Sequence, residues 1–169
     1  MIDKLKTELC YDENRVLVAG NSSGSWLANE LSCKYSGDTR GYAVRGVVSN
    51  QGGLPTQPEW TPTCTTAPTA GTWVYAVGDT TDVFPAPKFA IARAMKVNGC
   101  QEFSYDTAQV EDFPIGAGQP ASTCKRIIGC PNSERYPLLV CALPGSAQGA
   151  HENVVNPAFG AFVQLLAPP

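Results

Sequence analysis

The chain has 169 residues and a net charge of −3; 43% of its residues are hydrophobic and 16% are charged. This length is typical of one globular domain, here 1–169, and the low charge content excludes a disordered chain. There is no basic run interleaved with aromatic residues, so we do not expect a nucleic-acid partner. There is also no apolar stretch of about 20 residues, so we do not expect a membrane-spanning helix or a membrane partner.

The first predicted elements alternate between helix and strand. A short helix is predicted over residues 2–9. Residues 15–19 are a compact run of branched and apolar side chains that ends at Gly20, which is typical of a buried parallel strand. Apolar residues then recur at helical spacing over 24–35, and a second strand is predicted over 42–49.

The middle of the chain continues this order. A loop rich in proline, threonine and glycine is predicted over 50–71, followed by a strand over 72–77. An amphipathic helix over 87–97 is expected to stop at the Asn-Gly pair 98–99. Residues 103–105 are a candidate for a short further strand.

The last third is predicted to hold one strand and one helix. An irregular stretch over 112–135 precedes a strand over 136–143, and a closing helix is predicted over 153–166. Strands that alternate with helices predict an α/β fold, with a mainly parallel sheet of about four to five strands flanked by helices.

Cysteine usage indicates the compartment. Seven cysteines are scattered among loops without C-x-x-C spacing, which favours disulfides in an oxidising environment over a metal site or buried free thiols. We therefore expect no metal and no cofactor. An odd number leaves one thiol without a partner in the chain. Residues 1–6 lack the apolar core of a signal peptide, so we expect any such signal to lie outside this chain.

A nucleophile motif lies between the first strand and the second helix. Gly20-Asn21-Ser22-Ser23-Gly24 fits G-x-S-x-G, in which a sharp turn presents the serine hydroxyl and small flanking residues let strand and helix approach. We expect Ser22 to be the nucleophile and the Ser23 N–H to be one oxyanion-hole donor. The alternative is an ordinary glycine-rich turn in which the serine side chain caps the helix.

A serine nucleophile needs a base and an acid. His151, the single histidine, lies in a glycine-containing loop after the last predicted strand, and it fits the order Ser, acid, His. Asp79 directly follows the third predicted strand and is our preferred acid. Asp82 stays open as the alternative acid, and either carboxylate could instead form an Asx-type turn.

Several short segments carry a family resemblance. They are Asp12-Glu13-Asn14-Arg15-Val16, the motif around Ser22, Gly78-Asp79 with Phe84, Asn98-Gly99-Cys100, Tyr136-Pro137-Leu138 and Gly149-Ala150-His151. At these residues the chain resembles the secreted feruloyl esterase and polyhydroxybutyrate-depolymerase-like branch of the α/β-hydrolase family. The resemblance implies a secreted hydrolase of carboxylic esters, aromatic (feruloyl-type) or polyester, that forms an acyl-enzyme on a Ser-His-Asp triad.

The chain also departs from that family. Val77 stands where the family often has histidine, and Glu152-Asn153 follow the histidine where Trp-Pro is common. The family places several strands and the loop with the second oxyanion donor before the nucleophile strand, whereas 14 residues precede Arg15 here. The resemblance therefore implies a truncated α/β-hydrolase fold and weak catalysis unless a second donor is supplied. An inactive, hydrolase-like binding module is the alternative.

Two further expectations depend on the resemblance. It implies an exposed sheet edge at the nucleophile strand and hence a homodimer or larger assembly, with a monomer capped by residues 1–12 as the alternative. It also implies a Cys10–Cys33 disulfide with Cys64 left over. The remaining four cysteines are Cys100, Cys124, Cys130 and Cys141. They allow three disulfide connectivities, and the sequence does not choose among them.

Overall fold

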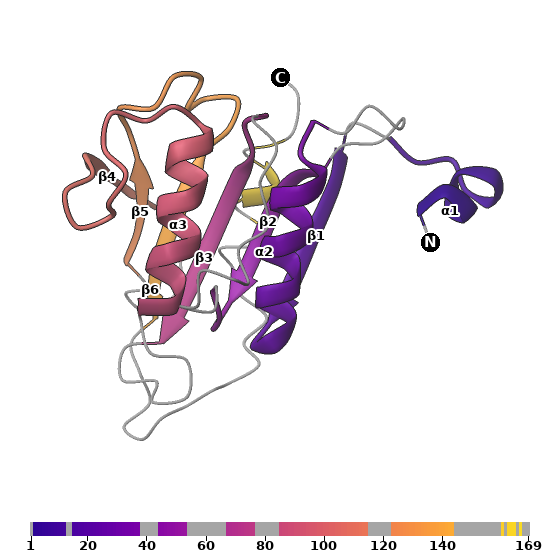
Figure 1. The fold of residues 1–169 in the computed structure, drawn as a ribbon, viewed down its shortest axis with the longest axis horizontal. Coiled ribbons are helices and arrows are strands. Elements are labelled where there is room, and N and C mark those ends of the chain that lie inside the picture. The colour runs from indigo at the N-terminus through magenta and orange to yellow at the C-terminus, as the bar shows by residue number, and fades with distance from the viewer. Residues whose placement is uncertain are drawn as a thin grey trace.

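A six-stranded sheet forms the centre of the molecule, in the order β1-β2-β3-β6-β5-β4 (Figure 1). The computed structural model describes residues 2–12, 15–37, 44–53, 67–76, 85–114, 123–143, 160, 162–164 and 166. The strands are β1 (Val16–Asn21), β2 (Val44–Asn50), β3 (Ala70–Ala76), β4 (Val110–Phe113), β5 (Thr123–Ile127) and β6 (Leu138–Leu143). The helices are α1 (Ile2–Glu8), α2 (Ser23–Tyr35) and α3 (Pro85–Val97).

Strand direction divides the sheet into two parts. β1, β2, β3 and β6 are parallel neighbours, whereas β5 and β4 continue the sheet in antiparallel pairing. Helices α2 and α3 lie side by side against one face (Figure 1), joined by an ion pair between Arg93 and Glu30 at 2.8 Å. The predicted α/β class and the mainly parallel sheet are confirmed.

The strand count corrects one expectation. β4 and β5 fall largely in the stretch 112–135 that was predicted to be irregular, so the sheet has six strands instead of four to five. Their pairing includes cross-strand ion pairs between Asp112 and Lys125, 2.7 Å apart, and between Glu111 and Arg126, 3.6 Å apart. Such partly exposed, charged strands lack the apolar run that marks a buried strand in sequence.

One further predicted element differs from the structure, and another lies partly outside the described residues. The predicted strand over 103–105 is a turn, in which the N–H of Thr107 donates to the carbonyl of Ser104 at 3.2 Å. This backbone bonds locally, so it does not join a ladder. Of the predicted helix over 153–166, the structure describes Gly160 and the stretch 162–164, which are helical, and the turn at Leu166.

The core covers both faces of the sheet. On the α2 and α3 side it contains Val47, Trp73, Ile91, Met95 and Leu138, among others. On the opposite side Phe162 packs with Val48, Ala70 and Leu139. Burial on both faces explains why β2, β3 and β6 are apolar without alternation. The expectation of a buried strand at 15–19 is wrong, because β1 is an outer strand without a fully buried residue. Among the tryptophans, Trp73 is buried in the core, Trp26 is 38% exposed, and Trp60 lies outside the described residues.

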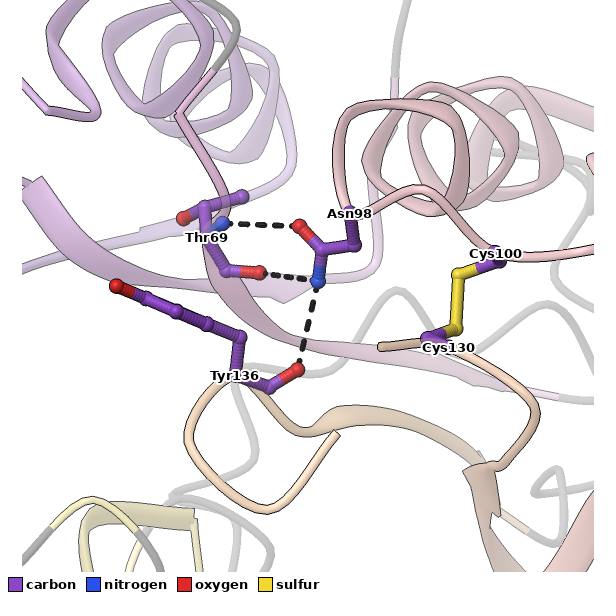
Figure 2. Close-up of a disulfide and its surroundings, with 5 residues drawn as sticks. All are labelled: Thr69, Asn98, Cys100, Cys130 and Tyr136. Atoms are coloured by element: carbon purple, nitrogen blue, oxygen red, sulfur yellow. Dashed lines mark hydrogen bonds between the residues drawn. A yellow bond between two sulfur atoms is a disulfide. The ribbon is translucent and has the colours of Figure 1, made fainter. Parts of the chain in front are cut away.

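The end of α3 joins the starts of two strands (Figure 2). Gly99 has a φ of 69°, and the N–H of Cys100 donates to the carbonyl of Met95 at 3.0 Å, so the predicted stop at 98–99 is confirmed. The buried carboxamide of Asn98 accepts the Thr69 N–H at 2.9 Å and donates to the carbonyls of Thr69 at 2.9 Å and Tyr136 at 3.4 Å. Asn98 therefore bridges the segments that lead into β3 and β6.

Disulfides corrected another expectation. Cys100 pairs with Cys130 and Cys124 with Cys141, which selects one of the three open connectivities. Cys33 is disulfide-bonded, but Cys10 is a free, exposed thiol, so the expected Cys10–Cys33 pair is wrong. Cys33 is buried on α2, whereas α1, which ends two residues before Cys10, stands apart from β1 (Figure 1). Cys64 lies outside the described residues.

Candidate active site

Ser22 occupies a sharp turn between β1 and α2. Its φ of 55° and ψ of −126° place a non-glycine residue in a sparsely populated conformation, which costs on the order of 1–3 kcal/mol. The Ser22 N–H donates to the carbonyl of Asn50 at 3.0 Å, and its carbonyl accepts the N–H of Ser25 at 2.9 Å. The Ser22 side chain makes no capping bond to the helix. Ser22 therefore stands at the N-cap position of α2 without a side-chain capping bond, and its hydroxyl is not committed to the helix.

Close approach of strand and helix requires glycine at one motif position. A Cβ atom on Gly20 would lie 2.0 Å from the carbonyl oxygen of Gly24, so any side chain there would force strand and helix apart. A Cβ atom on Gly24 would meet nothing within 4 Å. We expected both flanking glycines to let strand β1 and helix α2 approach each other. This expectation holds for Gly20 and is wrong for Gly24, which contributes its backbone to the contact but has room for a side chain.

A third glycine, outside the motif, also supports the turn. A Cβ atom on Gly52 would lie 2.5 Å from the carbonyl oxygen of Ser22 and 2.6 Å from the Cβ atom of Ser25. The Ser25 hydroxyl is fully buried and lies 2.6 Å from the carbonyl of Gly20 and 2.7 Å from that of Asn50. Ser25 thus ties the end of β1 to the end of β2 beneath the turn.

The neighbouring strand end has a similar shape. β1 and β2 are in register at Asn21 and Asn50, whose carboxamides are joined by a hydrogen bond of 2.7 Å. Gln51, directly after β2, has a φ of 49°, and its N–H donates to the carbonyl of Val74 at 2.7 Å. Two non-glycine residues with positive φ, Ser22 and Gln51, thus follow adjacent strands. Such backbone strain is concentrated at functional sites.

A buried amide fixes α2 behind the turn. The Asn29 carboxamide nitrogen lies within hydrogen-bond distance of the Ser25 carbonyl, the Ser49 hydroxyl and the Gly53 carbonyl, at 2.8, 3.0 and 3.2 Å. Its oxygen accepts the indole N–H of Trp73 at 3.0 Å. These bonds link α2 to β3 and to the segment after β2, so the helix that begins at Ser23 cannot shift independently of the sheet.

The electrostatics at this strand end favour a developing negative charge. The first turn of α2 contains no acidic residue, so the partial positive charge at the helix start is uncompensated there. Ser23 is its first residue, and a backbone N–H at this position can stabilise an oxyanion. At the adjacent end of β3, burial raises the pKa of the Tyr75 hydroxyl, an effect that the charge of Lys88 partly offsets.

The other predicted site residues, Asp79, Asp82 and His151, lie outside the described residues. The strands that precede them, β3 and β6, are parallel to β1 and end at the same edge of the sheet. Loops that leave this edge form the ligand sites of parallel sheets. Sequence reasoning missed Ser25, Asn29, Ser49 and Asn50; the available signal was polar residues at the end of apolar strand β2 and within α2.

Compared with models of known protein families and with curated proteins, the sequence matches none. Within the described part of the chain, no group of three or more histidine, cysteine or acidic side chains is arranged to hold a metal ion. Among the same residues, no helix has the length and apolar character that crossing a membrane requires.

Proposed function

We propose that the protein is a serine esterase that hydrolyses carboxylic esters at Ser22. The observation that carries the proposal is the conformation of Ser22, a positive φ at the junction of strand β1 and helix α2, with a side chain that makes no capping bond to that helix. A strained serine in this position is the defining feature of a nucleophile elbow.

The proposed reaction has two steps. The Ser22 oxygen attacks the acyl carbon while His151 takes the hydroxyl proton, and the proton then passes to the departing alcohol. A water molecule, deprotonated by His151, attacks the acyl-enzyme and releases the acid, and the proton returns to Ser22. Asp79 orients the imidazole, and the Ser23 N–H stabilises the oxyanion in both steps. No metal or cofactor takes part.

Covalent labelling tests this proposal. A fluorophosphonate probe is expected to label the folded protein at Ser22, and Ser22→Ala is expected to lose both the label and the hydrolysis of p-nitrophenyl acetate. The matched control is Ser23→Ala, which keeps the neighbouring backbone N–H and should still be labelled. Absence of labelling in the folded wild type would refute the esterase. Stabilisation by an ester ligand without turnover would then favour the binding module.

The proposed substrates are aromatic feruloyl-type esters or polyester oligomers, on the strength of the family resemblance. An ester panel with methyl ferulate, polyester oligomers and short p-nitrophenyl esters, run beside Ser22→Ala, distinguishes them. We also propose that the protein is secreted, because the two described disulfides need an oxidising compartment to persist.

Finally, we propose a homodimer through the β1 edge. β1 is an outer strand of the sheet, it contains no charged residue, and its described partner is β2 alone. The opposite outer strand, β4, carries Glu111 and Asp112, and such charges protect an edge from pairing. Helix α1 stands apart from β1, to the side of its outer edge (Figure 1), and among the described residues no strand pairs with this edge. We propose that the β1 edge pairs with a second copy.

A further inference from the structure

The Asn21–Asn50 pair closes the carboxyl end of the β1–β2 ladder. The Asn50 carboxamide nitrogen donates to the Asn21 carboxamide oxygen at 2.7 Å, and Asn50 is 8% exposed. Because side chains alternate along a strand, Asn50 shares the face of Val48, whose side chain packs with Phe162. Ser25 and the α2 helix support the turn from the opposite face. Asn50 therefore contacts the turn from the side that α2 leaves open.

Asn50 is not explained by stability. Its carboxamide oxygen is buried and has no hydrogen-bond partner among the residues that the structure describes. A buried polar atom without a partner is unfavourable, and an apolar side chain of similar size would avoid this penalty. Within the described part of the chain, the amide makes its hydrogen bond through the end that holds Asn21. The structure thus contains an energetically costly side chain next to the proposed nucleophile.

Asn50 reaches the turn in two ways. Its main-chain carbonyl accepts the N–H of Ser22 at 3.0 Å, and its side chain holds Asn21, the residue before Ser22. A backbone conformation like that of Ser22 persists only where the surroundings enforce it. We infer that Asn50 is a positioning residue for Ser22, which keeps the hydroxyl and the Ser23 N–H in the geometry for acyl transfer. This inference rests on the proposed esterase activity.

The test uses Asn50→Leu in the full chain, with p-nitrophenyl acetate hydrolysis, fluorophosphonate labelling and thermal unfolding measured together. We expect kcat and the labelling rate to fall by about 10-fold or more, with KM within about 2-fold of the wild type, because a misplaced nucleophile affects the chemical step. We expect the melting temperature to be unchanged or higher, because the buried unpaired oxygen is removed. A purely structural residue would show the reverse, a lower melting temperature and an unchanged kcat.

Thr72→Val is the matched control. Thr72 is fully buried on β3, and its hydroxyl also has no partner among the described residues. Its position lies on the same face of the sheet, in register with Val48. Strand β2 separates β3 from β1, which leads to Ser22, so this variant should keep the wild-type labelling rate and kcat. Asn21→Ala should reproduce the effect of Asn50→Leu, and the double variant should cost no more than either, since both remove one interaction.

Two results would overturn the inference: wild-type labelling and kcat in Asn50→Leu, or additive losses in the double variant. Amide hydrogen exchange at Ser22 separates this inference from the proposed activity, because it needs no turnover. Exchange about 10-fold faster in Asn50→Leu than in the wild type and Thr72→Val supports the positioning role even if the wild type takes up no label. If Asn50→Leu shows unchanged exchange at Ser22 together with wild-type labelling, the positioning role is refuted, while the proposed esterase activity is still supported.

Discussion

Gly20 lies directly against the backbone of Gly24, so that a Cβ atom added to Gly20 would sit 2.0 Å from the Gly24 carbonyl oxygen. Gly20→Ala is therefore expected to destabilise the fold by about 1–3 kcal/mol, typical of overpacking, and to lower labelling of Ser22. Urea unfolding and fluorophosphonate labelling measure the two effects. Gly24→Ala is the matched control, because its Cβ atom meets nothing within 4 Å, and it should keep wild-type stability. Equal destabilisation by both variants would contradict the steric argument.

His151→Ala and Asp79→Asn are each expected to remove nearly all hydrolysis, and Ser22→Ala combined with His151→Ala should cost little more than either alone. Hydrolysis should rise with pH through about 6–7, where a histidine loses its proton and becomes a base. A flat profile from about pH 5 to 8 would contradict a histidine base. Asp82→Asn tests the acid, since a larger loss there than in Asp79→Asn would transfer the role to Asp82.

Asn98→Ala is expected to lower the free energy of unfolding by about 3 kcal/mol, because main-chain groups of Thr69 and Tyr136 would lose buried partners. Denaturant unfolding measures this loss. The exposed Gln101→Ala serves as the control and should change stability by less than about 0.5 kcal/mol. Comparable values for the two variants would show that the Asn98 bridge does not stabilise the sheet.

Cys10 is expected to react with iodoacetamide in the native, unreduced protein, since it is a free and exposed thiol. Peptide mapping should locate the modification at Cys10 and should leave Cys33 and the four paired cysteines unmodified. Cys10→Ser should abolish the modification at this position without changing the melting temperature. Protection of both Cys10 and Cys33 from iodoacetamide in the native protein would contradict the free thiol and support a disulfide between them.

Ala19→Lys is expected to convert the proposed dimer into a monomer, because a charge on an exposed position of the β1 edge opposes pairing with a second chain. Light scattering coupled to size exclusion measures the mass, which is 17.9 kDa for one chain. Val110→Lys adds the same charge at the β4 edge and should leave the dimer intact. A wild-type mass near that of one chain at all concentrations would rule out the assembly.

Local patterns in the sequence determined the α/β alternation, the turn at Ser22 and the stop at residues 98–99. Each of these features depends on residues that are close together in the sequence: the spacing of apolar side chains in a helix or strand, or a short motif that requires a positive φ. Sequence neighbours alone are therefore enough to predict them. The expected acid and base, Asp79 and His151, rest on such local patterns too, and they stay predictions.

Only the tertiary structure decided the β4–β5 pairing, the disulfide partners and the support of Ser22. Charged strands become recognisable once cross-strand partners meet. Cysteines pair according to which segments the fold brings together, as where Cys124 on β5 lies opposite Cys141 on β6. Likewise, Ser25 and Asn50 are 25 residues apart in the sequence, yet their contact at 2.7 Å helps to hold the turn. Such contacts follow from the packing of α2 on the β1–β2 ladder, which brings distant segments together, and no local pattern encodes which polar side chains will then face one another.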